Sequence, residues 1–295
     1  MRRIHLAYSI FFFFIPTIVS AQLSDLAKIE YTILPKGNSS IDYHRFRALF
    51  NYPVKLKENS FFLFGLDYSN IDLSFDKSVV AFETKNIEEF QLLDLNIGYT
   101  IKMNQDWRFG AKFAPGISSN LTANNLSLDD IVLSGLFVFI KDKREDRTLV
   151  KPYRLILGVS YSGNQGIGFP LPFISYYKKF HPNWSFNIGI PKSNLQYHLS
   201  EKSRFKLFAQ LDGFNGNIQK GLIVNETKRA EKINMAAVVG GLRYEYKFTK
   251  HLEFFSNIGY ILRSTAELQD KGNNNILALD NDNLFYLRTG IRLKL

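Results

Sequence analysis

The sequence predicts an all-β protein, an antiparallel up-and-down transmembrane β-barrel of about 14 strands with short periplasmic turns and longer extracellular loops. Apolar and polar residues alternate with a period of two along most of residues 22–295. Many alternating segments reach roughly nine residues, whereas strands of globular proteins have about five or six and tilted membrane strands need about 9–11. A soluble β-sandwich also alternates, so it is the strand length, together with the amphipathic strand that closes the chain, that favours the barrel.

A secretory signal peptide is predicted over residues 1–21. A short positive segment at residues 2–3 precedes an apolar stretch at 6–19, and small residues end at Ala21. The apolar stretch is shorter than the roughly 20 residues that a membrane-spanning helix needs. We therefore expect cleavage between Ala21 and Gln22 and export of the remaining chain.

The composition of the chain narrows its class. It has 37 Lys and Arg against 27 Asp and Glu, a formal net charge of +10, and no Cys. Without Cys, neither a disulfide framework nor a lipid-anchored N-terminus is possible. No linker or shift in composition divides residues 22–295, so we expect one domain. The basic residues are spread along the chain, with no basic run that alternates with aromatic residues, so no nucleic-acid partner is expected.

The predicted strands each carry an apolar face and a polar face. In one of them Phe46, Phe50 and Tyr52 share a face, while Arg45 and Arg47 share the other. Two segments are less regular, because 128–140 is apolar on both faces and 171–179 has prolines near its start; if the latter or the pair around Pro191 is irregular, 12 strands are the alternative. The predicted strands are 27–33, 46–56, 62–69, 93–102, 107–113, 128–140, 153–162, 171–179, the pair around Pro191, 205–212, 238–248, 252–263 and 284–295.

The connections between these strands alternate in length. Tight turns are expected after Leu56, Met103, Phe180, Ser200 and Phe248. Longer polar segments lie between them and are expected to be extracellular loops, as is usual for outer-membrane barrels. With an even number of strands, both termini lie on the periplasmic side. The long loops are expected at 76–88, 117–127, 213–232 and 264–282.

The last strand resembles the assembly signal that the outer-membrane insertion machinery reads. That signal has a polar residue, then Gly two positions later, then hydrophobic residues at the antepenultimate and final positions, and here these are Arg288, Gly290, Leu293 and Leu295. Such proteins usually end in an aromatic residue, and Leu295 departs from that pattern. The resemblance implies outer-membrane lipid and the barrel-assembly machinery as partners.

The wider layout resembles a family of outer-membrane barrels of unknown function from Gram-negative bacteria. The residues that carry this resemblance are 30–35, 51–56, Trp184 with 189–192, 199–202 and 211–213, and together they extend along nearly the whole exported chain. The resemblance implies a barrel in the outer membrane and no known activity.

Basic residues on the polar faces suggest what the lumen could do. Arg243, Arg263, Arg288 and Arg292 fall on three successive predicted strands, and neighbouring strands lie about 4.8 Å apart. In a water-filled lumen, such a cationic wall would concentrate anions. The leading hypothesis is therefore a passive channel for small polar or anionic solutes. The alternative is a structural or surface-interaction barrel, in which these residues pair with carboxylates and close the lumen.

An outer-membrane enzyme is the third hypothesis. No local motif of a Ser–His or Asp–His hydrolase is found, and neither catalytic residues nor a cofactor are expected. His198 alternates with Gln196 and Ser200, which favours a position in the lumen; a Ser together with an Asp or Asn beside it would favour the enzyme. The segment 280–283 is acidic but lacks the Gly and the distal Glu of a calcium loop, so no metal is expected.

Overall fold

The computed structural model describes residues 25–35, 41–76, 78, 82–123, 125–144, 146, 151–225, 228–279 and 285–294. The predicted signal peptide and its cleavage site lie outside these residues. The described residues form β-strands and two short 3₁₀ turns, η1 (Lys85–Ile87) and η2 (Leu128–Asp130). The strands are β1 (Ala27–Leu34), β2 (Ile41–Lys57), β3 (Ser60–Phe75), β4 (Glu89–Lys102), β5 (Trp107–Ser119), β6 (Ile131–Asp142), β7 (Tyr153–Ser162), β8 (Leu171–His181), β9 (Trp184–Ile190), β10 (Lys192–His198), β11 (Ser203–Asn225), β12 (Lys228–Lys247), β13 (Leu252–Gln269), β14 (Asn275–Ala278) and β15 (Phe285–Leu293).

Fourteen of these strands form a closed antiparallel barrel, which confirms the predicted fold class. Each strand from β1 to β13 pairs with the next one along the chain, and β15 closes the ring between β13 and β1. The short β14 lies outside the ring and pairs with β13 only. The pair around Pro191 is regular, as β9 and β10 are antiparallel neighbours, so the count of 14 is right and the alternative of 12 is wrong.

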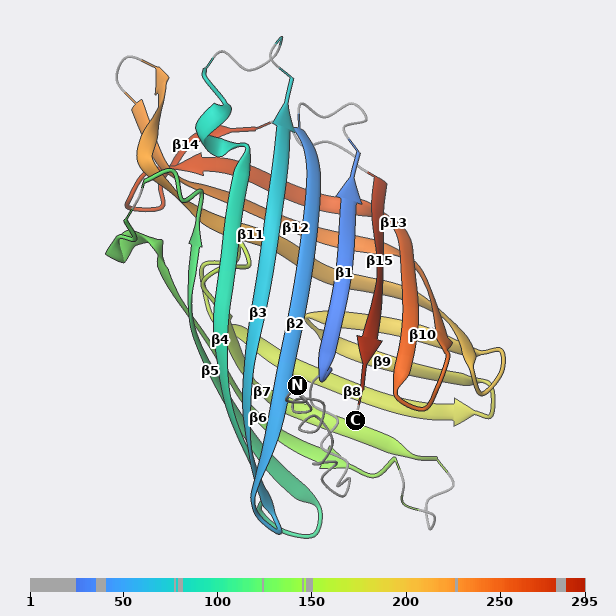
Figure 1. Ribbon diagram of the computed structural model, residues 1–295. Coiled ribbons are helices and arrows are strands. Elements are labelled where there is room, and N and C mark those ends of the chain that lie inside the picture. Colours follow the sequence, from blue (N-terminus) through green and yellow to red (C-terminus); the bar gives the residue numbers. More distant parts are fainter. Residues whose placement is uncertain are drawn as a thin grey trace, which may run out of the picture.

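The strands of the barrel wall differ greatly in length (Figure 1). Strands β2 and β3 have 17 and 16 residues, and β11, β12 and β13 have 23, 20 and 18. In contrast, β8 has 11 residues, and β9 and β10 have 7 each. We call β8–β10 the low wall.

The long strands cross over the barrel beyond the low wall. β11 pairs with β10 only as far as Gln210, and further out its Asn217 pairs in parallel with Ser119 of β5. The outer parts of β12 and β13 follow β11 because all three remain hydrogen-bonded to one another. We call residues 213–225, 228–238 and 263–269 the crossing sheet.

The main apolar core lies under the crossing sheet, inside the barrel. The inward side chains of β2–β4 meet those of β11–β13 there, and most are almost fully buried. Apolar packing of this kind is expected for a protein interior but not for a water-filled pore. The members of this core include Ile41, Tyr43, Ile71, Leu73, Phe90, Leu92, Phe214, Ile218, Ile233, Met235 and Leu268.

Two predicted loops are strands instead. Residues 213–225 and 228–232 form the outer parts of β11 and β12, and 264–269 continue β13. Their polar residues predict loops, but those residues alternate with the apolar ones that fill the core.

The structure also explains why the segment 128–140 is apolar on both faces. Inward Val138 and Ile140 of β6 pack against Ile156 of β7 in a smaller cluster, while the other face points outward.

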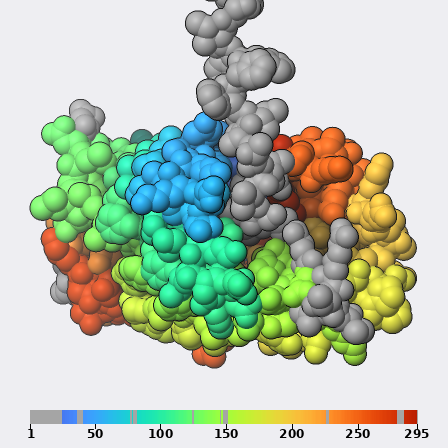
Figure 2. All heavy atoms as spheres, turned by 90° about the horizontal axis from the view of Figure 1, so that it is seen from below, coloured from blue at the N-terminus to red at the C-terminus, as the bar shows by residue number. Residues whose placement is uncertain are grey.

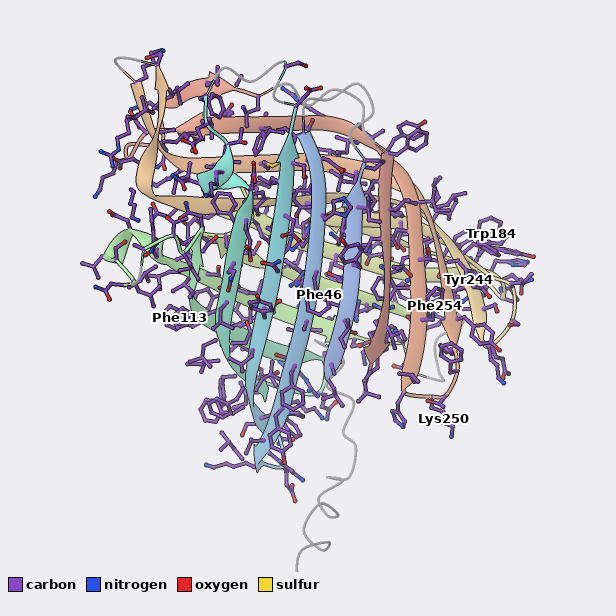
Figure 3. The ribbon with its side chains drawn as sticks, turned by 45° about the horizontal axis from the view of Figure 1, so that its top comes forward. Phe46, Phe113, Trp184, Tyr244, Lys250 and Phe254 are labelled. Atoms are coloured by element: carbon purple, nitrogen blue, oxygen red, sulfur yellow. The ribbon has the colours of Figure 1, made fainter. Side chains whose placement is uncertain are left out.

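The outer surface of the barrel is apolar, as the alternation predicts. Phe50, Leu66, Phe137, Leu207 and Leu242 are all more than half exposed on outward positions of five different strands. In Figure 3, Phe113 and Trp184 project away from the wall on opposite sides of the barrel. A protein in water rarely shows so much apolar surface, whereas a barrel in lipid requires it.

The tight turns gather at one end of the molecule. The connections after Leu56, Met103, Phe180, Ser200 and Phe248 are all short, as expected. Figure 2 looks at this end, where several of these hairpin tips outline an oval. The end with the long strands and loops is called the outer end below.

Gly290 is essential to closure, because β15 lies between two strands at this point. A Cβ atom there would stand 2.4 Å from the carbonyl oxygen of Ile29 and 2.8 Å from the ring of Phe255. We predict that Gly290→Val prevents assembly, since overpacking alone costs about 1–3 kcal/mol and an unpaired strand edge in lipid costs several more. The measurement is the heat-dependent shift in electrophoretic mobility of the folded barrel. Leu287→Val on the outward face of β15 is the control and should assemble; a Gly290→Val protein that assembles equally well would contradict the β1–β15 pairing.

Candidate functional site

Three of the four predicted lumen arginines do point into the barrel. Arg243 lies on β12, and Arg288 and Arg292 lie on β15, with their side chains largely buried. Arg263 does not join them, and its prediction as a lumen residue is corrected. The pairing slips at this place, because Val239 pairs with Ile261 but Val238 pairs with Arg263. The extra residue, Leu262, is a β-bulge, and a shift of one residue turns Arg263 to the exposed face.

These three inward arginines are paired with carboxylates rather than free. Near the short turns, Glu245 and Glu253 are each only 1% exposed. Arg292 Nη2 lies 2.9 Å from Glu245 Oε1, and Arg292 Nε donates to Glu253 Oε1 at 2.8 Å. Arg243 Nε lies 2.7 Å from Glu245 Oε1, and its guanidinium lies over the ring of Phe255 at 4.1 Å. Arg204, Lys206 and Lys294 complete this lower ionic layer.

A second ionic layer crosses the lumen above the first. Arg288 Nη2 lies 2.5 Å from Asp212 Oδ2, which also accepts a hydrogen bond from the hydroxyl of Tyr286 at 3.0 Å. Arg47 Nε donates to Asp67 at 2.8 Å. The other members are Lys28, Glu30 and Arg45.

The two ionic layers and the apolar core together fill the lumen beside the long strands. Among the described residues, two cavities between these side chains have volumes of about 30 and 50 Å³, which is room for a few water molecules. A cationic surface attracts anions only if its charge is not already neutralised. The three inward arginines therefore do not form the unpaired cationic wall that the sequence predicts.

A much larger cleft lies at the outer end, on the back of the crossing sheet. It has a volume of about 710 Å³. One side is formed by the polar face of β11–β13, and the other by the ends of β5–β7 and by the loop 163–170. Since β8–β10 are short, no long strand stands beside the sheet on this side (Figure 1). The sequence alone does not reveal this cleft, because the polar residues of 213–232 predict a loop.

A buried carboxylate, Asp130, fastens the crossing sheet to the η2 turn. Asp130 is fully buried (0% exposed) and no cation contacts it among the described residues. Asn217 Nδ2 donates to Asp130 Oδ1 at 2.6 Å, and Gln219 Nε2 donates to Asp130 Oδ2 at 2.7 Å. The backbone N–H of Ser127 also donates to Oδ2, at 2.7 Å. Both carboxylate oxygens are therefore hydrogen-bonded, as a buried charge requires.

These hydrogen bonds set the pKa of Asp130. Burial by itself would raise the pKa of this carboxyl. The Ser119 hydroxyl and the Ser127 N–H act in the opposite direction by hydrogen bonding to the charged form, as do the amides of Asn217 and Gln219. The net effect lowers the pKa from 3.8 to about 2. A pKa that is lower in the folded state stabilises the folded state above the unfolded-state pKa.

We predict that Asp130→Asn loosens the crossing sheet. The amide turns a donor toward groups that already donate, and an unsatisfied buried polar group costs about 1–3 kcal/mol. Hydrogen exchange of residues 215–220 should rise at neutral pH. In the wild type, the stabilisation that Asp130 gives to the contact between the η2 turn and the crossing sheet should be complete above about pH 4. It should be lost as the pH falls toward 2. The variant should lack this pH dependence.

Asp129→Asn is the matched control for this experiment. The neighbouring Asp129 is half-exposed and pairs with Lys271 at 2.9 Å, and exposed ion pairs contribute only about 0–1 kcal/mol. If Asp129→Asn and Asp130→Asn raise exchange equally, Asp130 does not fasten the sheet.

A Ser–His pair is present, which is part of the arrangement that would favour an enzyme. Ser185 Oγ lies 2.8 Å from His198 Nε2, on the neighbouring strands β9 and β10. However, Ser185 is 0% exposed, and among the described residues no Asp or Asn side chain contacts the His198 ring. A nucleophile must reach its substrate, and its base needs an orienting partner. We therefore interpret this pair as a structural hydrogen bond.

The remaining predicted site residues are placed as follows. Arg288, Gly290 and Leu293 of the assembly signal lie in β15. Leu295, Ala21, Gln22 and the acidic segment 280–283 lie outside the described residues. Within the part of the chain that the structure describes, no group of three or more His, Asp or Glu side chains could hold a metal ion. In the same part, no helix is long and apolar enough to cross a membrane.

A family model, the domain of unknown function DUF6268, matches residues 38–294. This chain belongs to the DUF6268 family. The sequence matches no curated protein.

Solved structures similar to this DUF6268 member include outer-membrane channels. The COG4313 outer membrane channel from Pseudomonas putida F1 is 10% identical, with 94% of this chain and 100% of that chain covered and a TM-score of 0.44. The KdgM porin in complex with disordered oligogalacturonate is 11% identical, with coverage of 91% and 99% and a TM-score of 0.39. The P. putida toluene transporter TodX is 12% identical, with coverage of 92% and 91% and a TM-score of 0.39.

Proposed function

We propose that this DUF6268 member is an outer-membrane barrel with a closed lumen that acts by binding at the cell surface. The observation that carries the proposal is the filling of the lumen beside the long strands by two ionic layers and an apolar core. The outer apolar face supports contact with outer-membrane lipid. The cleft at the outer end, with its volume of about 710 Å³, is the recess in which binding would occur.

A passive channel for small polar or anionic solutes is the second candidate. It is favoured by the size of the barrel, because 14 strands lie between the eight-stranded barrels that side chains fill and the 16–18-stranded porins that hold water. Opening such a channel would require the ionic layers to part. That would leave buried charges without partners, at a cost of several kcal/mol.

We predict that the protein in planar bilayers gives no stable conductance steps in potassium chloride. The ion pairs of Glu245 and Glu253 and the apolar core above them leave no continuous water path beside the long strands. The heat-dependent mobility shift of the reconstituted protein should be recorded in parallel, so that missing insertion is not mistaken for a closed lumen. Reproducible steps from inserted protein would favour the channel, and their reversal potential in a salt gradient would give its ion preference.

Export is part of the same proposal. We propose that residues 1–21 are removed, that the barrel-assembly machinery reads the terminal strand, and that the mature chain begins at Gln22. The tripartite signal before Ala21 supports this. The intact mass of protein purified from outer membranes should correspond to residues 22–295, and a mass that includes Met1 would contradict cleavage.

A further inference from the structure

The polar cleft contains hydrogen-bonding groups that the protein itself does not use. Asn234 and Thr265 line the cleft from β12 and β13, and neither side chain has a partner among the described residues. Asn215 lines it from β11; its Nδ2 donates to the carbonyl of Gly163 at 3.2 Å, but its Oδ1 is buried without a partner. Buried polar atoms are normally hydrogen-bonded, but this oxygen has almost no accessible surface, so a ligand in the cleft would meet Asn234 and Thr265 instead.

The free groups are the amide of Asn234 and the hydroxyl of Thr265, which suit a neutral ligand with many hydroxyls. An amide offers both donors and acceptors, so it can bind two adjacent hydroxyl groups at once. The two groups lie on neighbouring strands of one sheet, about 4.8 Å apart from strand to strand. A rigid sheet holds them at fixed spacing, which favours specific recognition.

The charged side chains of the cleft already have hydrogen-bond or ion-pair partners. Lys232 Nζ donates to Asn273 Oδ1 at 2.7 Å, and Glu267 Oε2 accepts from Gln269 Nε2 at 2.9 Å. Asp129 pairs with Lys271. With one basic and two acidic residues lining it, the cleft has no cationic cluster for a phosphate or a polyanion.

Aromatic residues border the same cleft. Tyr161 lies near the end of β7, and Phe169 lies in the loop 163–170 with much of its ring exposed. An exposed aromatic face can pack against the C–H groups of a sugar ring, which otherwise meet only water. The cleft volume of about 710 Å³ is also within the range of about 300–1,000 Å³ that is usual for ligand sites.

We propose that this cleft binds a neutral oligosaccharide. Asn234 and Thr265 bind its hydroxyl groups, and Tyr161 and Phe169 contact its ring faces. The inference rests on the proposed surface-binding function and names its ligand class. The sugar comes either from free oligosaccharides outside the cell or from the head of a glycolipid in the same leaflet.

The test is a titration of the full-length purified protein in phospholipid nanodiscs. Maltotriose, cellotriose and chitotriose serve as neutral probes, trigalacturonate as the acidic comparison, and calorimetry or a thermal shift as the readout. At least one neutral trisaccharide should bind, and the acidic one should bind more weakly. Asn234→Ala should weaken binding at least tenfold, and so should Thr265→Val, an exposed position where the substitution leaves folding unaffected.

Gln105→Ala is the matched control, because Gln105 is an exposed amide without a side-chain partner in the β4–β5 turn at the opposite end. It should leave affinity unchanged. The proposal is overturned if no neutral trisaccharide binds, if binding survives both cleft substitutions, or if trigalacturonate binds best. None of these results depends on conductance, so a failure here is distinct from a failure of the closed-lumen proposal.

A second set of nanodiscs distinguishes the two sources of sugar. These contain smooth lipopolysaccharide in addition to phospholipid. If the lipopolysaccharide competes with the free trisaccharide, the glycolipid head is the ligand in the membrane. If the affinity is the same in both sets, the site serves free oligosaccharides.

Discussion

The departure of β11 from β10 is the constraint on which the rest of the outer end depends. A strand that leaves its neighbour must find other partners for its backbone groups, because an unpaired buried N–H or C=O is costly. Here the partners come from β5 and the loop 163–170. The N–H of Asn120 donates to the carbonyl of Asn217 at 3.2 Å, the Ser118 hydroxyl donates to the carbonyl of Asn215 at 2.5 Å, and the N–H of Asn215 donates to the carbonyl of Asn164 at 3.1 Å.

This constraint explains the composition of the outer end. Short polar side chains reach nearby backbone groups at little entropic cost, which is why Asn and Ser concentrate where β11 crosses. Gly166 lies in the same contact, with a positive φ of 75° and a Cβ position that would stand 2.1 Å from the carbonyl oxygen of Met235. Only glycine allows the loop to approach the crossing sheet so closely.

The alternation of the sequence predicted the barrel, the number of strands and the tight turns, because these depend on local periodicity. It could not predict where the register shifts. The bulge at Leu262 turns Arg263 from the lumen to the outside, and no local pattern distinguishes a bulge from a continuous strand. Nor could polarity distinguish a loop at 213–232 from a strand whose second face borders a polar cleft.

A count of basic and acidic residues does not show how much free charge the lumen carries. Basic residues outnumber acidic ones on the inward faces, yet each of Glu245 and Glu253 touches several cations at once, so a small number of carboxylates holds many basic groups. Arginine suits this arrangement because its planar fork binds carboxylates while its face stacks on Phe255. A surplus of arginines therefore measures neither free charge nor pore width, since both depend on which side chains meet across the barrel.

The crossing sheet helps to fill the lumen with one of its faces and borders the polar cleft with the other. Its two faces alternate along the same strands, so the residues that fill the barrel, such as Phe214 and Met235, are interleaved with those that border the cleft, such as Asn215 and Asn234. A one-residue slip in register would exchange the two faces and expose the apolar one to water. The buried Asp130 opposes such a slip, because its partners Asn217 and Gln219 lie two residues apart on one strand and both must meet the same carboxylate. The hydrogen bonds of Asp130 therefore hold the register on which both the closed lumen and the shape of the cleft depend.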